Sequence, residues 1–137
     1  MTDYVAYHQG EWIPFSQVRI HPMDRGFIVG DAVFDVARTF NGKSFRMREH
    51  IDRLYRSLKY IRLDPGKTID EMEQLSEEII TRNEHLRPAV GDFAIWQAVT
   101  RGVGRWAHQA GPPVALAVDP AKAGRAFVEE SLSPGQG

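Results

Sequence analysis

The sequence contains no cysteine among its 137 residues. Disulfide bonds, thiolate metal ligands and thiol nucleophiles are therefore excluded from any function assigned to these residues. The sequence also lacks an apolar stretch long enough to cross a bilayer, and its first thirty residues contain no apolar signal-peptide core. These absences predict a cytoplasmic location and no membrane partner.

An excess of either charge is also lacking. The chain has 17 basic and 18 acidic residues, a formal net charge of −1. Because nucleic-acid-binding domains usually carry a basic excess, we expect no nucleic-acid partner. The five histidines never stand at the spacing that places two metal ligands on one helix face, so we expect no metal site. The 42% hydrophobic content is that of a soluble globular domain.

Turn signals and alternating apolar residues predict several strands. Apolar residues on both sides of Gln9-Gly10 predict a short hairpin near the N-terminus, which residues 18–20 could extend. Asn41-Gly42 is a strong hairpin signal and predicts a turn between strands at 32–40 and 43–47. Two further strands are expected at 93–100 and 113–118, joined by the glycine-rich link 101–104.

Between these strands the apolar spacing changes to three and four residues, which predicts two helices. Thr68 is the expected N-cap of the second helix, with Glu71 as its capping-box partner. Strands, two helices and strands again predict an α+β domain with an antiparallel sheet, which we place at residues 1–119. Residues 120–137 are expected to form a poorly ordered linker and tail. The first helix is lined by Met47, Ile51, Leu54, Leu58 and Ile61, and the second by Ile69, Met72, Leu75, Ile79 and Leu86.

Residues 24–31 are the first candidate site. Gly26 and Gly30 allow positive φ or a close approach of the backbone to a ligand. Composition alone favours a tight loop with a structural Asp–Arg pair. The two glycines form neither a dinucleotide fingerprint nor a P-loop, because the required helix is not expected to follow them.

Arg53 and the loop 100–108 are two further candidates. Arg53 adjoins the buried stripe of the first helix, and its planar guanidinium suits a bidentate contact with phosphate or carboxylate. A solvated helix arginine is the alternative, and composition alone favours it. The loop carries Arg105, Trp106 and His108, which could meet an anionic substrate or form an ordinary surface turn.

Taken together, these segments resemble the opening of the class IV (fold type IV) pyridoxal-phosphate (PLP) aminotransferases. That family includes D-amino-acid, branched-chain and (R)-selective amine aminotransferases and aminodeoxychorismate lyase. The resemblance covers the family's small N-terminal domain, from about Tyr4 to Val118, and is closest to the D-amino-acid enzymes. It is carried, in order and spacing, by Asp24-Arg25-Gly26-Phe27, Gly30-Asp31-Ala32-Val33-Phe34-Asp35, Asn41-Gly42, Phe45-Arg46, His50-Ile51-Asp52-Arg53-Leu54, Val99-Thr100-Arg101-Gly102 and Ala107-His108-Gln109.

The resemblance assigns roles to five residues. It implies that Arg53 binds the phosphate of PLP and that Phe34 and Val29 line the substrate pocket. Val29 is small where relatives often have Tyr or Phe. Arg105 and His108 fall on the loop that helps to hold the substrate α-carboxylate in D-amino-acid enzymes, although the arginine stands one position early. The substrates implied are an amino acid or amine and a 2-oxo acid.

The family's catalytic lysine has no match in this sequence. In the family it attaches the cofactor, moves the Cα proton, and lies in a larger second domain. We therefore expect a truncated aminotransferase without catalytic residues, inactive alone, that forms a homodimer or needs a missing large domain. The alternatives are a non-catalytic binding or assembly module, half of a split enzyme, or a protein resembling aminodeoxychorismate lyase. The chain's own lysines are Lys43, Lys59, Lys67 and Lys122.

Overall fold

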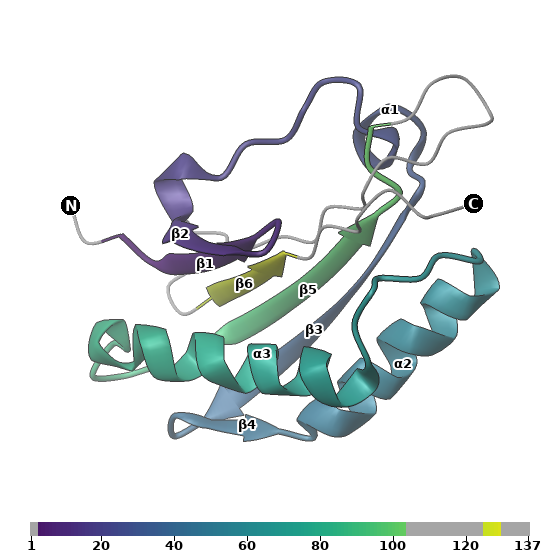
Figure 1. Cartoon of the computed structure of the whole chain (residues 1–137). Coiled ribbons are helices and arrows are strands. Elements are labelled where there is room, and N and C mark those ends of the chain that lie inside the picture. Colours follow the sequence, from purple (N-terminus) through teal and green to yellow (C-terminus); the bar gives the residue numbers. More distant parts are fainter. Residues whose placement is uncertain (1–2, 104–124, 130–137) are drawn as a thin grey trace.

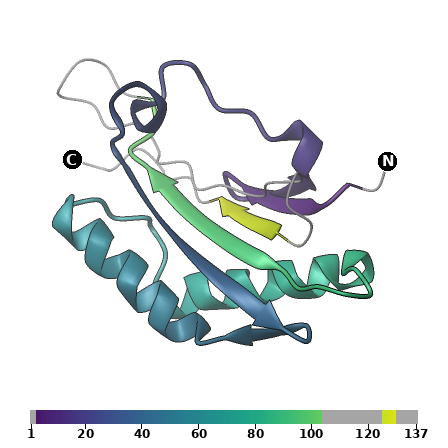
Figure 2. The ribbon, with the colours of Figure 1, turned by 180° about the vertical axis from the view of Figure 1, so that it is seen from behind.

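The structure, a computed structural model, describes residues 3–103 and 125–129. Within these residues six strands form one sheet in the order β2-β1-β6-β5-β3-β4. Two long helices, α2 and α3, lie on the same face of the sheet (Figure 1), and Figure 2 shows β3 and β5 from the opposite side. The strands are β1 (Val5–His8), β2 (Glu11–Pro14), β3 (Ala32–Phe40), β4 (Lys43–Phe45), β5 (Ala94–Thr100) and β6 (Arg125–Glu129). The helices are η1 (Phe15–Gln17), α1 (Arg25–Val29), α2 (Met47–Tyr60), α3 (Ile69–Asn83) and η2 (Glu84–Leu86).

The predicted α+β class is confirmed, but the sheet is not wholly antiparallel. Strand β6 lies between β1 and β5 and is parallel to both. It falls within residues 120–137, for which the sequence predicted a linker and tail, so this strand was not predicted. A run of five residues gives a weak local signal, and its place in the sheet depends on pairing with distant strands. The strand predicted at 113–118 lies outside the described residues.

Both predicted hairpins are confirmed. Gln9 and Gly10 have φ of 51° and 88°, and Asn41 and Gly42 have φ of 51° and 75°. Two successive positive φ values are those of a type I′ turn, whose twist matches that of the flanking strands. Beyond the first hairpin the chain forms η1, so residues 18–20 do not extend the hairpin, an extension that their sequence allowed.

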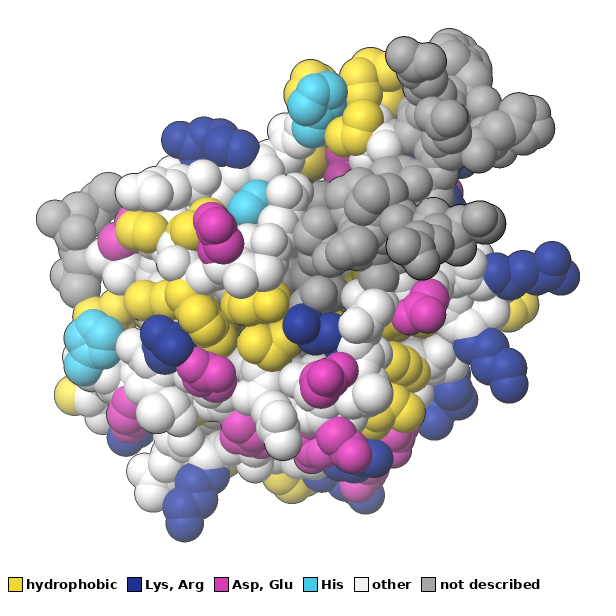
Figure 3. Space-filling view, in the orientation of Figure 1, with side chains coloured by type: hydrophobic (Ala, Val, Ile, Leu, Met, Phe, Trp, Pro, Cys, Tyr) yellow, Lys and Arg dark blue, Asp and Glu magenta, His cyan; other side chains and the backbone are white. Residues whose placement is uncertain are grey.

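The core lies between the two long helices and the sheet. Helix α2 buries the predicted stripe except Ile61, which stands just past the helix end and is half-buried. The outward side of both helices carries acidic and basic side chains together (Figure 3). Arg48 of α2, for example, forms a salt bridge of 2.8 Å with Glu73 of α3. No helix of the described part has both the length and the apolar content that a membrane span requires. The core comprises Ala37, Met47, Ile51, Leu54, Leu58, Met72, Ile79, Ile80, Phe93, Ile95 and Val99, among others.

The start of α3 shows the capping box that the sequence predicted. The backbone N–H of Glu71 donates to the Thr68 hydroxyl oxygen at 3.1 Å, and the backbone N–H of Thr68 donates to the Glu71 carboxylate at 2.7 Å. Two backbone donors that the helix cannot pair internally are thereby satisfied. This cap fixes the position at which α3 begins.

Replacing the N-cap residue of α3 should lower the stability of the fold. We expect Thr68→Ala to lower the free energy of unfolding by about 1 kcal/mol, because a helix donor loses its acceptor. Thr68→Ser keeps a hydroxyl at the same place and should retain most of the stability. Urea unfolding followed by circular dichroism measures both variants. Equal losses for Ser and Ala would show that the hydroxyl is not what stabilises this end.

Candidate functional site

Residues 24–31 contain a short helix where the sequence predicted a loop. Asp24 is fully buried and caps α1, because its carboxylate accepts from the Gly26 N–H at 2.7 Å and from the Thr100 hydroxyl at 3.0 Å. A Cβ atom on Gly26 would lie 2.6 Å from Cγ2 of Thr100, so only glycine fits there. Gly30 ends the helix with φ of 69°. Helix α1 has five residues, too few for an apolar period to reveal it.

The Asp–Arg pair predicted for this segment joins Arg25 to Asp31. Arg25 Nε lies 3.0 Å from Oδ2 of Asp31, and Arg101 Nε lies 2.7 Å from the same oxygen. Burial alone would raise the pKa of Asp31, but hydrogen bonds from Arg101 and Arg25 outweigh it and hold the pKa below its ordinary value. Arg101 also donates to the carbonyl oxygen of Ile61 at 2.8 Å. The group therefore ties α1 to the end of β5 and the end of α2.

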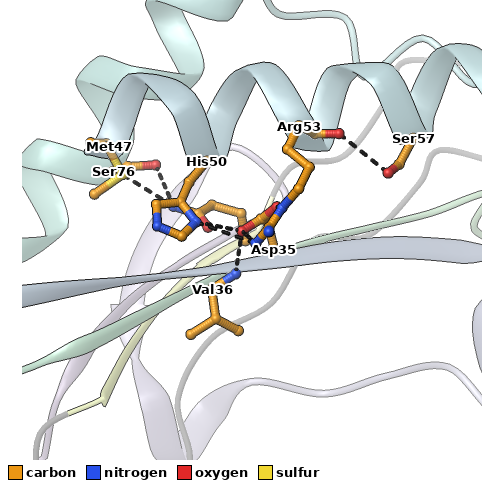
Figure 4. A network of polar contacts seen from close by, with 8 residues as sticks. Asp35, Val36, Met47, His50, Arg53, Ser57 and Ser76 are labelled. Carbon is orange, nitrogen blue, oxygen red and sulfur yellow. Dashed lines mark hydrogen bonds and ion pairs between the residues drawn. The ribbon is translucent and has the colours of Figure 1, made fainter. Parts of the chain in front are cut away.

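A second cluster joins α2 to β3 and contains Arg53 (Figure 4). Arg53 Nε lies 2.6 Å from Oδ2 of Asp35, and Arg53 Nη2 lies 2.8 Å from Oδ1. His50 Nδ1 is also 2.8 Å from Oδ1. The two helix residues stand three positions apart, which places both side chains on one side of α2. Asp35 faces them because alternate residues of β3 point toward the helices.

Burial and charge oppose each other at Asp35. Its side chain is 2% exposed, against 60% for Arg53. Burial alone would raise the pKa of Asp35, but hydrogen bonds from Arg53 and His50 outweigh it and hold the pKa below its ordinary value. The same hydrogen bond raises the pKa of Arg53 above its usual value. The carboxylate and the guanidinium are therefore both charged at neutral pH.

The cluster lies at an open part of the edge of β3. The Thr39 N–H donates to the Phe93 carbonyl beside β5, so the N–H of Val36, three residues away, points to the other side of the strand. There it donates to Oδ1 of Asp35 at 2.8 Å. Strand β4 pairs only with residues 38–40 of β3. Within the described part, no strand therefore covers this edge beside Asp35.

Arg53 presents a free end of its guanidinium at this edge. Asp35 occupies Nε and one N–H of Nη2, and Nη1 has no partner among the residues that the structure describes. The group has five N–H donors in one plane, so Nη1 and the outer N–H of Nη2 can still bind an anion side by side. Residues 3–103 and 125–129 contain no group of three His, Asp or Glu side chains that could hold a metal ion.

The other residues proposed from the sequence are more scattered. Phe34 points to the sheet face opposite Asp35, is 61% exposed, and packs edge-on against Trp96 with ring centres 5.5 Å apart. Val29 is the last residue of α1 and is also exposed. Arg105 and His108 lie outside the described residues. The structure thus places Arg53 on the sheet face that the helices cover and Phe34 on the opposite face.

Asp35 and His50 were named from the sequence only as members of longer motifs, with no role of their own. Asp35 is the one acidic residue in the mostly apolar run 32–40, and a carboxylate in such a run requires a cation beside it. His50 precedes Arg53 by three residues, the spacing of neighbours on a helix surface. The acidic residue in an apolar run and the three-residue spacing were both visible in the sequence. Neither shows that strand 32–40 lies beneath the helix that carries His50 and Arg53.

The fold is that of the N-terminal domain of class IV aminotransferase structures. The sequence pattern of the family described as "Amino-transferase class IV" matches residues 32–133. The chain belongs to this family.

Two curated relatives show how much of a family member the chain represents. It is 32% identical over 99 residues to the D-alanine aminotransferase of Staphylococcus aureus (strain N315), a match covering 72% of this chain and 33% of that protein. It is 34% identical over 119 residues to a putative branched-chain-amino-acid aminotransferase of Methanocaldococcus jannaschii, covering 87% and 36%. The chain thus spans about a third of the length of these relatives.

Solved structures support the same fold. A branched-chain amino acid aminotransferase from Escherichia coli aligns with a TM-score of 0.68 and 24% identity, over 100% of this chain and 42% of that one. A second branched-chain amino acid aminotransferase, solved in complex with N-(5'-phosphopyridoxyl)-L-glutamate, aligns with a TM-score of 0.68 and 20% identity, over 96% and 40%. At these identities the likeness establishes the fold alone.

The depressed pKa of Asp35 predicts a pH-dependent stability. Because this pKa is lower in the folded chain than in the unfolded chain, the carboxylate stabilises the fold above the ordinary aspartate pKa of about 3.9. That contribution is lost as the pH falls through the lower, folded-state pKa. The gap in unfolding free energy between the wild type and Asp35→Asn should therefore be full at about pH 6 and shrink steadily below about pH 4. Urea unfolding at several pH values measures it, and a gap independent of pH would contradict the ion pair.

Proposed function

We propose that this chain forms the phosphate-holding part of the PLP site of an aminotransferase, with Arg53 as the phosphate ligand. The observation that carries the proposal is the guanidinium of Arg53, which a buried carboxylate holds on one edge while the other edge faces solvent. A planar fork with two parallel N–H groups matches two oxygens of a phosphate. Bound PLP supplies the electron sink for amino-group transfer.

The charge of the cluster indicates that further groups complete the phosphate site. Arg53 and Asp35 together are close to neutral, whereas a phosphate ester is a dianion near neutral pH. The Arg53 fork orients the phosphate but cannot balance its charge alone. The chain also spans only about a third of its curated relatives. We infer that a second domain, on the same or another polypeptide, supplies the remaining donors and the lysine that attaches the cofactor.

Residues 1–137 alone are accordingly proposed to bind but not to catalyse. The reaction of the complete enzyme would move an amino group from an amino acid or amine to a 2-oxo acid. Phe34 and Val29 are proposed to line the substrate pocket, since both present apolar side chains to solvent. Arg105 and His108 are proposed to meet the substrate carboxylate. D-alanine and branched-chain amino acids are the candidate substrates that the names of the relatives suggest.

Substitution of Arg53 tests the phosphate role. We expect Arg53→Gln to weaken binding of pyridoxal 5'-phosphate at least tenfold, because charge-assisted hydrogen bonds contribute about 1.5–3 kcal/mol and each 1.4 kcal/mol is about tenfold in affinity. Arg53→Lys keeps the positive charge but loses the planar pair of donors. Its affinity should lie between those of the wild type and Arg53→Gln. Titration calorimetry with the full chain measures the affinities.

Two controls distinguish loss of the phosphate contact from a general loss of structure or charge. Arg56→Gln removes an exposed arginine one helical turn from Arg53 and should leave the affinity unchanged. Pyridoxal without its phosphate should bind the wild type and Arg53→Gln equally. An Arg53→Gln variant that binds pyridoxal 5'-phosphate as tightly as the wild type would remove Arg53 from the site.

Exposed aromatic side chains on the sheet face away from α2 and α3 favour a second candidate function, an assembly module that docks with a partner. Phe34, Phe40 and Phe45 are 61%, 56% and 53% exposed. Phe40 and Phe45 pack edge-on with ring centres 5.4 Å apart on the hairpin. Exposed aromatic surface of this kind marks an interaction site. The partner proposed is a second copy of the chain or a separately encoded large domain.

Self-association measures this exposed surface. We expect the full chain to form dimers or larger species in light scattering, because burying the phenylalanine side chains removes apolar surface from water. Phe40→Ser should shift the distribution toward monomer. Tyr60→Ser removes a side chain that is 89% exposed at the end of α2, and should leave the distribution unchanged. A wild-type chain that stays monomeric at high concentration would count against the assembly function.

A further inference from the structure

We propose that Asp35 and His50 are positioning residues for Arg53. The Asp35 carboxylate holds the His50 ring with its proton on Nδ1, and the two side chains fix the direction in which the guanidinium faces solvent. The proposal rests on the proposed function only for the identity of the anion that Arg53 binds. The orientation of the three side chains is a property of the chain itself.

The Asp35 carboxylate has partners at both of its oxygens. Oδ1 accepts from the Val36 N–H and Arg53 Nη2 and lies beside His50 Nδ1, each at 2.8 Å, and Oδ2 accepts from Arg53 Nε at 2.6 Å. An ionised carboxylate can only accept. The contact with His50 is therefore a hydrogen bond only if Nδ1 carries the proton, which leaves Nε2 of the neutral ring unprotonated.

His50 and Arg53 also approach each other directly. Nδ1 of His50 lies 3.5 Å from Nη2 of Arg53. With a proton on Nδ1, both nitrogens are donors, so this approach is not a hydrogen bond. His50 therefore acts on Arg53 through Asp35, by fixing the carboxylate that both contact.

Without the Asp35 carboxylate, the Arg53 side chain would have considerable conformational freedom. Its side chain is 60% exposed, and a free arginine side chain occupies many rotamers. The carboxylate that restrains it is 2% exposed and is held by the Val36 backbone as well as by His50. Ordering the guanidinium before the anion arrives removes that cost from binding. Loss of His50 or Asp35 should therefore weaken anion binding although neither need touch the anion.

The ring proton of His50 is directly observable. The ¹⁵N chemical shifts of the imidazole in the full chain should show Nδ1 protonated in the neutral ring. Asp35→Asn should shift the population toward the Nε2-protonated form, because the carboxylate no longer selects the first form. A wild-type ring protonated on Nε2 would overturn the proposal without any ligand being present.

A pair of matched substitutions tests which ring nitrogen matters. An Asn side chain places its amide N–H near the position of Nδ1, and a Gln side chain places it near that of Nε2. Inorganic phosphate and pyridoxal 5'-phosphate are the probes, titrated into the full chain. His50→Asn should keep the affinity within about twofold, whereas His50→Gln should lower it about fivefold, the effect of one net hydrogen bond of about 1 kcal/mol. The opposite ranking, or no loss with either variant, would overturn the proposal.

The order of the Arg53 side chain provides a readout that a loss of general stability would not mimic. NMR relaxation of the Arg53 Nε–Hε group should show it restrained in the wild type and in His50→Asn, and more mobile in His50→Gln. The unfolding midpoints of the variants show that they are folded when measured. Equal Arg53 order in the three proteins would refute the positioning role.

The two proposals fail in different ways. If Arg53→Gln leaves phosphate affinity unchanged, the proposed function fails, while the ring proton and the Arg53 order still decide the positioning role. If Arg53→Gln weakens binding but His50→Gln does not, the phosphate site stands and the positioning role is wrong.

Discussion

The ionised carboxylate of Asp35 sits between a strand and a helix, where it has to be paired. An unpaired buried charge is strongly destabilising. The Asp35 carboxylate is paired by the Arg53 guanidinium, the His50 ring and the Val36 N–H. The pairing also fixes where α2 lies over β3. The same contact that stabilises the α2–β3 packing therefore directs a guanidinium to an open sheet edge, and structure and proposed function share one interaction.

Local features of the fold were accessible from the sequence. Asn41-Gly42 predicted its turn because only a few residue types adopt two positive φ values, and Thr68 with Glu71 predicted the start of α3. The spacing of Met47 to Leu58 predicted the buried side of α2. Each of these signals lies within a few residues of the feature that it predicts.

Most of the missed features depend on residues far apart in the chain. Strand β6 is defined by neighbours β1 and β5, and α1 by a carboxylate that reaches both Gly26 and Thr100. For the candidate site, Arg53 was proposed by family resemblance, whereas composition alone favoured a solvated helix arginine. The partner that orients it, Asp35, lies 18 residues away. No local pattern states that this strand passes beneath this helix.

The position of β6 bears on how the chain folds as it is synthesised. Within the described part, the β1–β2 hairpin joins the rest of the sheet only through β6, which lies more than a hundred residues later. Strands β3, β4 and β5 can pair as soon as residue 100 has left the ribosome, whereas the gap beside β5 stays open until residues 125–129 emerge. Asn83 of α3 can hold the Val5 backbone before then, but β1 gains its neighbour on the β5 side only when β6 is made. Until then the facing edges of β1 and β5 remain unpaired in the nascent chain, and such edges can pair wrongly with other strands.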